Sequence, residues 1–233
     1  GSDKAGIYSV AYSLSQVMII LNSALLNTLN PWIYKKINLK EYDEIGKISY
    51  YMLIVIAFFN FLLVAIAPEV ISIIAPEEYY KAIWVIPPIT ASVFFMFMYS
   101  LFADFEFYFE KTKFIMIASV ISAALNIFLN IIFIKRFGFI AAGYTTLVCY
   151  ILYAISHYLF MRKINKDCMN GIRVYNAKLL ILIGLTFVIV CGLTVLFYNF
   201  PMVRYIVLGT SLFVIILKKN KILNLFQKIK VER

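Results

Sequence analysis

The chain has 233 residues, of which 63% are hydrophobic and only 15% are charged, and its mean hydropathy is +0.88. Soluble domains carry about a quarter charged residues, so this composition excludes an ordinary water-soluble protein. The net charge of +10 would suit a nucleic-acid partner, but the cations are spread between apolar stretches, and no nucleic-acid partner is predicted.

Seven stretches are apolar enough to cross a bilayer, which takes roughly 20 residues for a hydrocarbon core of about 30 Å. Each must be a helix, because lipid offers an open backbone no hydrogen-bond partner. The sequence therefore predicts an all-α integral membrane protein with about seven transmembrane helices. In chain order the spans are residues 7–33, 49–67, 82–105, 114–134, 139–161, 178–198 and 203–217.

The segments between the spans differ in charge. Of the 22 Lys and Arg residues, 17 fall on one side of the membrane and 5 on the other. Cytoplasmic segments carry the excess of such residues, which predicts a cytoplasmic C-terminus and places residue 1 on the outer side. An outside start, and an opening Gly1-Ser2 in place of Met, indicate a piece of a longer protein with at least one preceding helix.

The first span gathers polar side chains on one arc about 100° wide at helical spacing. The arc consists of Ser9, Tyr12, Ser13, Gln16, Ser23, Asn27 and Asn30. Polar groups avoid lipid, so this arc is predicted to face either a hydrated cavity or another helix. The candidates for lining a cavity are Ser13, Gln16, Ser23 and Asn27. Residues 36–48, which follow this span, are predicted to form a cytoplasmic helix that joins it to the second span.

The third span contains Pro87 and Pro88 near its outer end, where they are expected to bend the helix by removing backbone donors. It ends in the stretch ADFEFYFEKTKF (103–114), in which acidic and aromatic residues alternate. The simplest interpretation is an interfacial aromatic belt with solvated acids. Asp104 is the deepest of these acids, and it is the candidate for gating or ion coupling.

Polar arcs also occur on the fourth and fifth spans. The fourth gathers Ser119, Ser122, Asn126 and Asn130, and the fifth gathers Gly143, Thr146, Tyr150, Tyr153 and His157. They face either a cavity or a neighbouring helix. In the second case, each interhelical side-chain hydrogen bond would stabilise the packing by about 1 kcal/mol. His157 is interpreted either as a hydrogen-bonded interior residue or as a proton relay. The cavity-lining candidates on these two spans are Asn126, Asn130, Tyr150 and His157.

The tail KKNKILNLFQKIKVER (218–233) has apolar residues at helical spacing with lysines between them. This pattern is typical of a helix that lies on an anionic inner leaflet. A disordered basic tail is the alternative interpretation.

Catalytic and metal-binding patterns are lacking in the sequence. It has no Ser/His/Asp set, HExxH motif or phosphate-binding glycine loop. Cys149, Cys168 and Cys191 lack CxxC or metal-ligand spacing. The sequence therefore predicts a protein that is not an enzyme and has no metal site or cofactor.

The stretch IASVISAALNIFLNIIFIKRFGFIAAGYTTLVCYILY (117–153) resembles the polysaccharide flippase family, part of the superfamily that includes multidrug and toxin extruders and the lipid II flippase. In that family, a helix with paired asparagines precedes a basic residue, an aromatic-glycine turn and a helix of small residues. Residues 5–36 and 105–120 also agree, so the likeness spans roughly 5–162.

The resemblance implies a two-lobe transporter. Residues 1–162 would be five helices of the second lobe without its first helix, 163–217 two extra C-terminal helices, and 218–233 a basic cytoplasmic tail. The implied activity is flipping of polyprenyl-diphosphate-linked oligosaccharide across the cytoplasmic membrane by alternating access, for O-antigen, capsule or other surface polysaccharide. The implied partners are this lipid-linked oligosaccharide, membrane lipid, a missing N-terminal lobe and other polysaccharide-assembly membrane proteins.

One feature departs from the superfamily, whose diphosphate-holding cavities commonly use buried cations. The spans here carry Lys and Arg only near their ends, as at Arg136 and Arg204. The diphosphate contacts are therefore expected either on the missing lobe or through another kind of neutralisation, and the fragment alone is not expected to transport.

Three other functions stay open. A cation-coupled multidrug extruder of the same superfamily would need buried acids, for which Asp104 is the candidate. A membrane glycan polymerase or acyltransferase would use a large outer loop or clustered His and Arg, and the longest outer connection, 68–81, has neither. The third is a non-transporting structural subunit.

Overall fold

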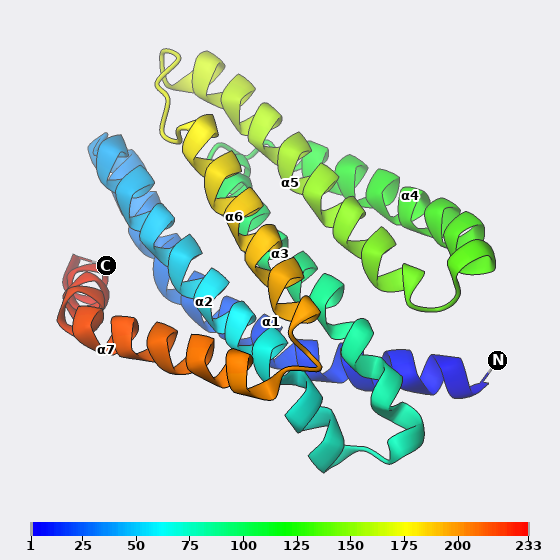
Figure 1. The fold of residues 1–233 in the computed structure, drawn as a ribbon. Coiled ribbons are helices and arrows are strands. Elements are labelled where there is room, and N and C mark those ends of the chain that lie inside the picture. The colour runs from blue at the N-terminus through cyan, green and yellow to red at the C-terminus, as the bar shows by residue number, and fades with distance from the viewer. Residues whose placement is uncertain (1, 233) are drawn as a thin grey trace.

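The computed structural model describes residues 2–232, which contain seven α-helices, one 3-10 helix and no strand (Figure 1). Each α-helix includes a segment long and apolar enough to cross a membrane. The prediction of an all-α, multi-pass membrane protein is therefore confirmed. In chain order the elements are α1 (Ser2–Leu39), α2 (Tyr42–Ile74), η1 (Glu77–Trp84), α3 (Ile86–Tyr108), α4 (Lys113–Phe137), α5 (Ala141–Cys168), α6 (Ala177–Leu196) and α7 (Pro201–Glu232).

Helix α3 lies at the centre of the bundle. It packs against α1, α2, α5 and α6, and most of its side chains are buried. Its phenylalanine rings form much of the core, together with Trp32 from α1 and Tyr175 from the segment before α6. Burial of such aromatic rings is a large part of the packing energy of a helical core.

Helix α4 lies at the edge of the bundle. It packs almost entirely on α5, and Ala118 is its only buried residue among those described. Since α4 is about as apolar as α3, most of its surface suits contact with lipid. Hydropathy alone therefore identified both spans but did not distinguish the central helix from the peripheral one.

The bend expected at Pro87 and Pro88 does not occur. Helix α3 begins at Ile86, so both prolines lie in its first turn, where the missing N–H groups have no helical partner to lose. Glu77–Trp84 form the separate η1 helix, and the third span therefore starts later than predicted.

The separate connecting helix predicted at 36–48 is wrong. Helix α1 continues to Leu39 and α2 begins at Tyr42, so the residues divide between two long helices. The break lies at Lys40, whose φ of 61° is left-handed and ends the α1 helix.

Helix α7 continues from the last span into the tail and ends at Glu232. Ile229 is 1% exposed, and the half-buried Leu225 and Phe226 pack against the main core. The disordered-tail alternative is therefore wrong. The apolar face that was expected on the leaflet is turned toward the bundle instead.

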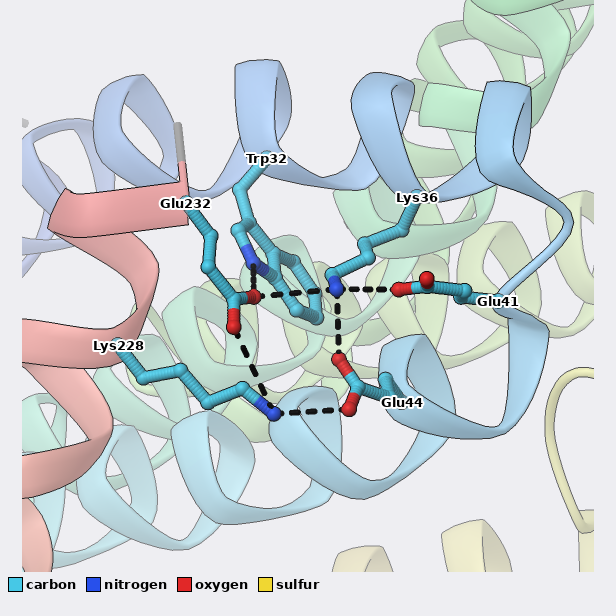
Figure 2. Close-up of polar contacts among 6 residues, drawn as sticks. All are labelled: Trp32, Lys36, Glu41, Glu44, Lys228 and Glu232. Atoms are coloured by element: carbon cyan, nitrogen blue, oxygen red, sulfur yellow. Dashed lines mark hydrogen bonds and ion pairs between the residues drawn. The ribbon is translucent and has the colours of Figure 1, made fainter.

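A cluster of charged residues fixes the tail to the junction of α1 and α2 (Figure 2). Lys36 Nζ lies 2.8 Å from Glu44 Oε2 and 3.1 Å from Glu232 Oε2, and it also pairs with Glu41. Partial burial opposes ionisation of Glu232, but its hydrogen bonds to Lys36 and Trp32 hold the pKa of its carboxyl below the usual range. We call this cluster the tail clamp; its members are Trp32, Lys36, Glu41, Glu44, Lys228 and Glu232.

Candidate functional site

Polar side chains from α1, α3, α4 and α5 meet in one groove with a volume of about 410 Å³. The N-terminal part of α1 reaches the side of the bundle where α4 and α5 lie (Figure 1). We call this hollow the polar groove. Its polar lining consists of Tyr8, Tyr12, Ser92, Tyr99, Ser119, Ser122, Asn126, Thr146, Tyr150 and Tyr153.

The lining of the polar groove is uncharged: the described residues that form it include no Lys, Arg, His, Asp or Glu. Tyrosine rings offer flat apolar faces with a hydroxyl at one end, and the amide and hydroxyl groups supply donors and acceptors. Such a surface is suited to an uncharged polar ligand. It offers nothing to neutralise a phosphate.

The paired asparagines connect α4 to α5. Asn130 Nδ2 donates to Asn126 Oδ1 at 3.0 Å, and Thr145 Oγ1 donates to Asn130 Oδ1. Asn126 Nδ2 also donates to Thr146 Oγ1 at 3.5 Å and to Cys149 Sγ at 3.7 Å. The asparagines therefore pack helices, as one interpretation predicted, and Asn126 in addition lines the polar groove.

Most of the polar arc predicted on the first span lies outside the polar groove. Ser13, Ser23 and Asn27 are exposed, Gln16 is half-buried, and none of the four lines the polar groove. Tyr12 is the member of that arc that does line it.

Two other polar residues of α1 are buried instead. Asn22 Nδ2 donates to the Val93 carbonyl of α3 at 2.9 Å, and Ser15 Oγ lies 3.5 Å from Thr90 Oγ1. Polar residues occur on several sides of α1. The side of α1 that packs on α3 determines which of them are buried, and Ser15 and Asn22 lie on that side. Ser15 and Asn22 therefore do not stand out in the sequence pattern.

The acids at the end of α3 are not solvated, contrary to the interpretation as an aromatic belt. Asp104 is 2% exposed and Glu106 is 0% exposed. Asp104 Oδ2 has no hydrogen-bond partner among the described residues. Asp104 is not among the residues that line the polar groove.

His157 and Glu106 form a buried pair beside the polar groove. His157 Nδ1 lies 2.6 Å from Glu106 Oε1, and both side chains are fully buried. His157 is thus a hydrogen-bonded interior residue that does not itself line the groove, whereas Tyr150, about two turns earlier on α5, does.

Three lining residues were missed by the sequence analysis: Tyr8 of α1 and Ser92 and Tyr99 of α3. Helix α3 is apolar on nearly all sides, so its few polar residues form no periodic arc. The sequence feature that could have indicated them is the recurrence of hydroxyl-bearing residues along α3, which is otherwise apolar.

A second hollow lies between α2, α6 and α7, with a volume of about 720 Å³. We call it the apolar cleft, because its lining is mainly aliphatic and phenylalanine side chains. Arg204 borders it, bonding Glu69 at 2.6 and 2.8 Å and the Ala65 carbonyl at 2.7 Å. This cation is therefore already neutralised.

Comparison of the chain with protein-family models, with curated proteins and with solved structures gave no match. Within residues 2–232, no group of three or more His, Cys, Asp or Glu side chains is placed to hold a metal ion.

Proposed function

We propose that this chain supplies the sugar-binding part of a transporter that flips polyprenyl-diphosphate-linked oligosaccharides across the cytoplasmic membrane for surface polysaccharide or lipopolysaccharide synthesis. The observation that carries the proposal is the convergence of polar side chains from four membrane-spanning helices on one uncharged groove. Polar residues at this depth are costly in lipid and mark substrate pathways. The resemblance of residues 5–162 to polysaccharide flippases supplies the substrate class.

In this proposal the sugar occupies the polar groove. The rings of Tyr99, Tyr150 and Tyr153 stack against sugar faces, while Asn126 and Thr146 exchange hydrogen bonds with its hydroxyls. The polyprenyl chain stays in the bilayer, because moving an apolar chain out of hydrocarbon is unfavourable.

The diphosphate is assigned to a missing N-terminal lobe. Lys36 and Arg204, the buried cations among the residues whose burial is described, are each paired with carboxylates and lie outside the polar groove. A facing lobe would also cover the exposed polar residues Ser23 and Asn27, which are costly in contact with lipid. In this arrangement the C-terminus is cytoplasmic and residue 1 is on the outer side.

Binding of a lipid-linked sugar tests the proposal. The purified chain in lipid nanodiscs is mixed with a synthetic polyprenyl-diphosphate-linked N-acetylglucosamine, and the affinity is measured for wild type, Tyr150→Leu and the control Asn27→Leu. We expect Tyr150→Leu to weaken binding about tenfold, or 1.4 kcal/mol, because it removes a ring and a hydroxyl from the groove. The control changes an exposed polar residue of α1 and should bind as wild type does.

Equal affinity in all three proteins would contradict the assignment of the sugar to the polar groove. Loss of surface glycan export in cells that carry Tyr150→Leu in the complete coding frame, with normal membrane insertion, extends the test to transport.

A cation-coupled multidrug extruder is the second candidate, favoured by the burial of Asp104 and Glu106 within α3. Buried carboxylates can hold and release a coupling cation. Efflux of an organic cation by the complete protein, abolished by Asp104→Asn, would favour this function over glycan export.

A further inference from the structure

The pair formed by Glu106 and His157 joins two helices at the core of the bundle. Glu106 lies near the end of α3 and His157 in the second half of α5, and these helices pack closely along their length. The Nδ1–Oε1 distance is 2.6 Å, and neither side chain is exposed. A hydrogen bond this short between fully buried partners fixes the position of both side chains.

Each member of the pair also has a polar atom left without a partner. Glu106 Oε2 and His157 Nε2 make no hydrogen bond to any described residue. A buried group of this kind is costly, and a buried charge is tolerated only when its partner carries the opposite charge. The protonation of the imidazole therefore decides whether the carboxylate beside it is neutralised.

The His157 imidazole contacts aromatic rings that line the polar groove. The ring centroid of His157 lies 4.3 Å from that of Tyr153, 5.3 Å from that of Tyr99 and 5.4 Å from that of Phe114. Tyr99 and Tyr153 both line the polar groove, and Tyr153 Oη lies 2.8 Å from Ser119 Oγ of α4. The imidazole thus supports the wall of the groove from behind.

Few other titratable groups face the pair in the described part of the chain. Helix α3 contributes Tyr99, α5 contributes Tyr153, and α4 contributes the uncharged ring of Phe114. Asp104 lies two residues before Glu106 on α3, which places its side chain roughly 200° around the helix axis from that of Glu106. Glu106 is therefore the charged partner that His157 contacts directly.

We propose that Glu106 and His157 are positioning residues for the wall formed by Tyr99 and Tyr153, and that protonation of this pair sets the affinity of the polar groove for its sugar ligand. With a protonated imidazole, the ion pair and the attraction between the imidazolium and the tyrosine rings hold the wall as observed. With a neutral imidazole, the carboxylate lacks its counter-charge and the wall loosens. This inference rests on the proposed function of the groove, and it adds a control by pH.

The affinity for the lipid-linked N-acetylglucosamine probe, measured in nanodiscs between about pH 5.5 and pH 8, tests the proposal. We expect wild type to bind about fivefold or more tightly at the lower pH, in the range typical of coupled sites. His157→Gln and Glu106→Gln should flatten the profile. Glu110→Gln, a change at an exposed acid in the turn after α3, is the matched control and should keep it.

His157 is the only histidine of the chain, so ¹⁵N-histidine labelling gives a direct readout without assignment. Addition of the probe to wild type at pH 7 should shift the ring nitrogen signals, and it should leave them unshifted in Tyr150→Leu. This readout needs no variant of the pair itself, so a failure of Glu106→Gln or His157→Gln to fold does not prevent the test.

The outcomes separate the two proposals. Probe binding with a flat wild-type pH profile and unshifted ring signals would overturn the positioning role and leave the sugar-binding groove standing. Absence of probe binding at every pH would overturn both.

Discussion

The polar groove and the apolar cleft are both hollows between membrane-spanning helices, and they differ in chemistry more than in size. The apolar cleft is the larger, at about 720 Å³ against about 410 Å³. Lipid chains can fill an apolar hollow with little gain or loss, because they are as apolar as its walls. A polar hollow in the same bilayer needs water or a polar ligand. Lining chemistry, rather than volume, therefore points to the groove as the functional site.

The largest expected effect concerns the charged pairs beside the two hollows. Glu106→Leu leaves His157 without its partner in a fully buried site, and the loss of one member of a buried pair costs about 3–5 kcal/mol of unfolding free energy. Glu69→Leu beside the apolar cleft should cost less, since the Glu69 side chain is 32% exposed and water can reach the site. Thermal unfolding of both variants in the same detergent checks this order, and equal losses would contradict it.

The next effect concerns one glycine of α5, a helix that lines the polar groove, and one glycine of α6, a helix that lines the apolar cleft. A Cβ at Gly143 of α5 would lie 2.9 Å from Pro88 Cγ and 3.4 Å from the Val85 carbonyl oxygen, so Gly143→Ala should destabilise by about 1–3 kcal/mol through overpacking. Gly192 of α6 has open space around it, and Gly192→Ala should stabilise the helix by up to about 1 kcal/mol. We therefore expect the unfolding temperature to fall in Gly143→Ala and to rise in Gly192→Ala. A shift of the same sign in both variants would show that the α3–α5 contact is not tight.

A smaller effect is expected when each hollow is filled. Ser122→Leu adds volume and removes a hydroxyl in the polar groove, and it should weaken binding of the lipid-linked sugar about tenfold. Thr186→Leu in the apolar cleft should leave binding unchanged and alter the unfolding free energy by only about 0.5 kcal/mol, as for a substitution at an exposed position. Weaker binding in Thr186→Leu alone would move the site to the cleft.

The smallest effect is expected at the tail clamp, which anchors α7, one wall of the apolar cleft. The pKa of the Glu232 carboxyl is lowered in the folded protein, so its contribution is present at neutral pH and is lost as the pH falls below its ordinary value of about 4.3. Partly exposed pairs contribute about 0–1 kcal/mol. In a Trp84→Phe background, the emission of Trp32, whose Nε1 lies 3.2 Å from Glu232 Oε2, should shift to the red on acidification.

Glu232→Gln is the control for the tail clamp. It removes the titrating group, so the acid transition in Trp32 emission should disappear while probe binding to the polar groove stays as in wild type. An unchanged transition in this variant would assign the signal to another group.

The fold could be predicted from the sequence because a membrane span is a local property. About twenty apolar residues and the need for internal backbone hydrogen bonds determine each helix, without knowledge of its neighbours. The prediction failed where one sequence feature is compatible with two structures. Proline can bend a helix or begin one, and Pro87 and Pro88 lie in the first turn of α3.

The site was predictable only in part. The asparagines and tyrosines of α4 and α5 repeat on one face of each helix, so Asn126 and Tyr150 could be found. The burial of Glu106 could not, because its partner His157 lies 51 residues away on another helix. The inward face of α1 was also missed, since polar residues occur on several of its faces and only packing against α3 selects Ser15 and Asn22.

The most direct test of the central claim is to map where a sugar contacts the chain. A polyprenyl-diphosphate-linked N-acetylglucosamine with a photoreactive group on the sugar is bound in nanodiscs, cross-linked by light and located by mass spectrometry of peptides. Cross-links in residues 119–126 of α4 and 146–153 of α5 are predicted. Cross-links confined to residues 182–197, in α6 and directly after it along the apolar cleft, would contradict the account.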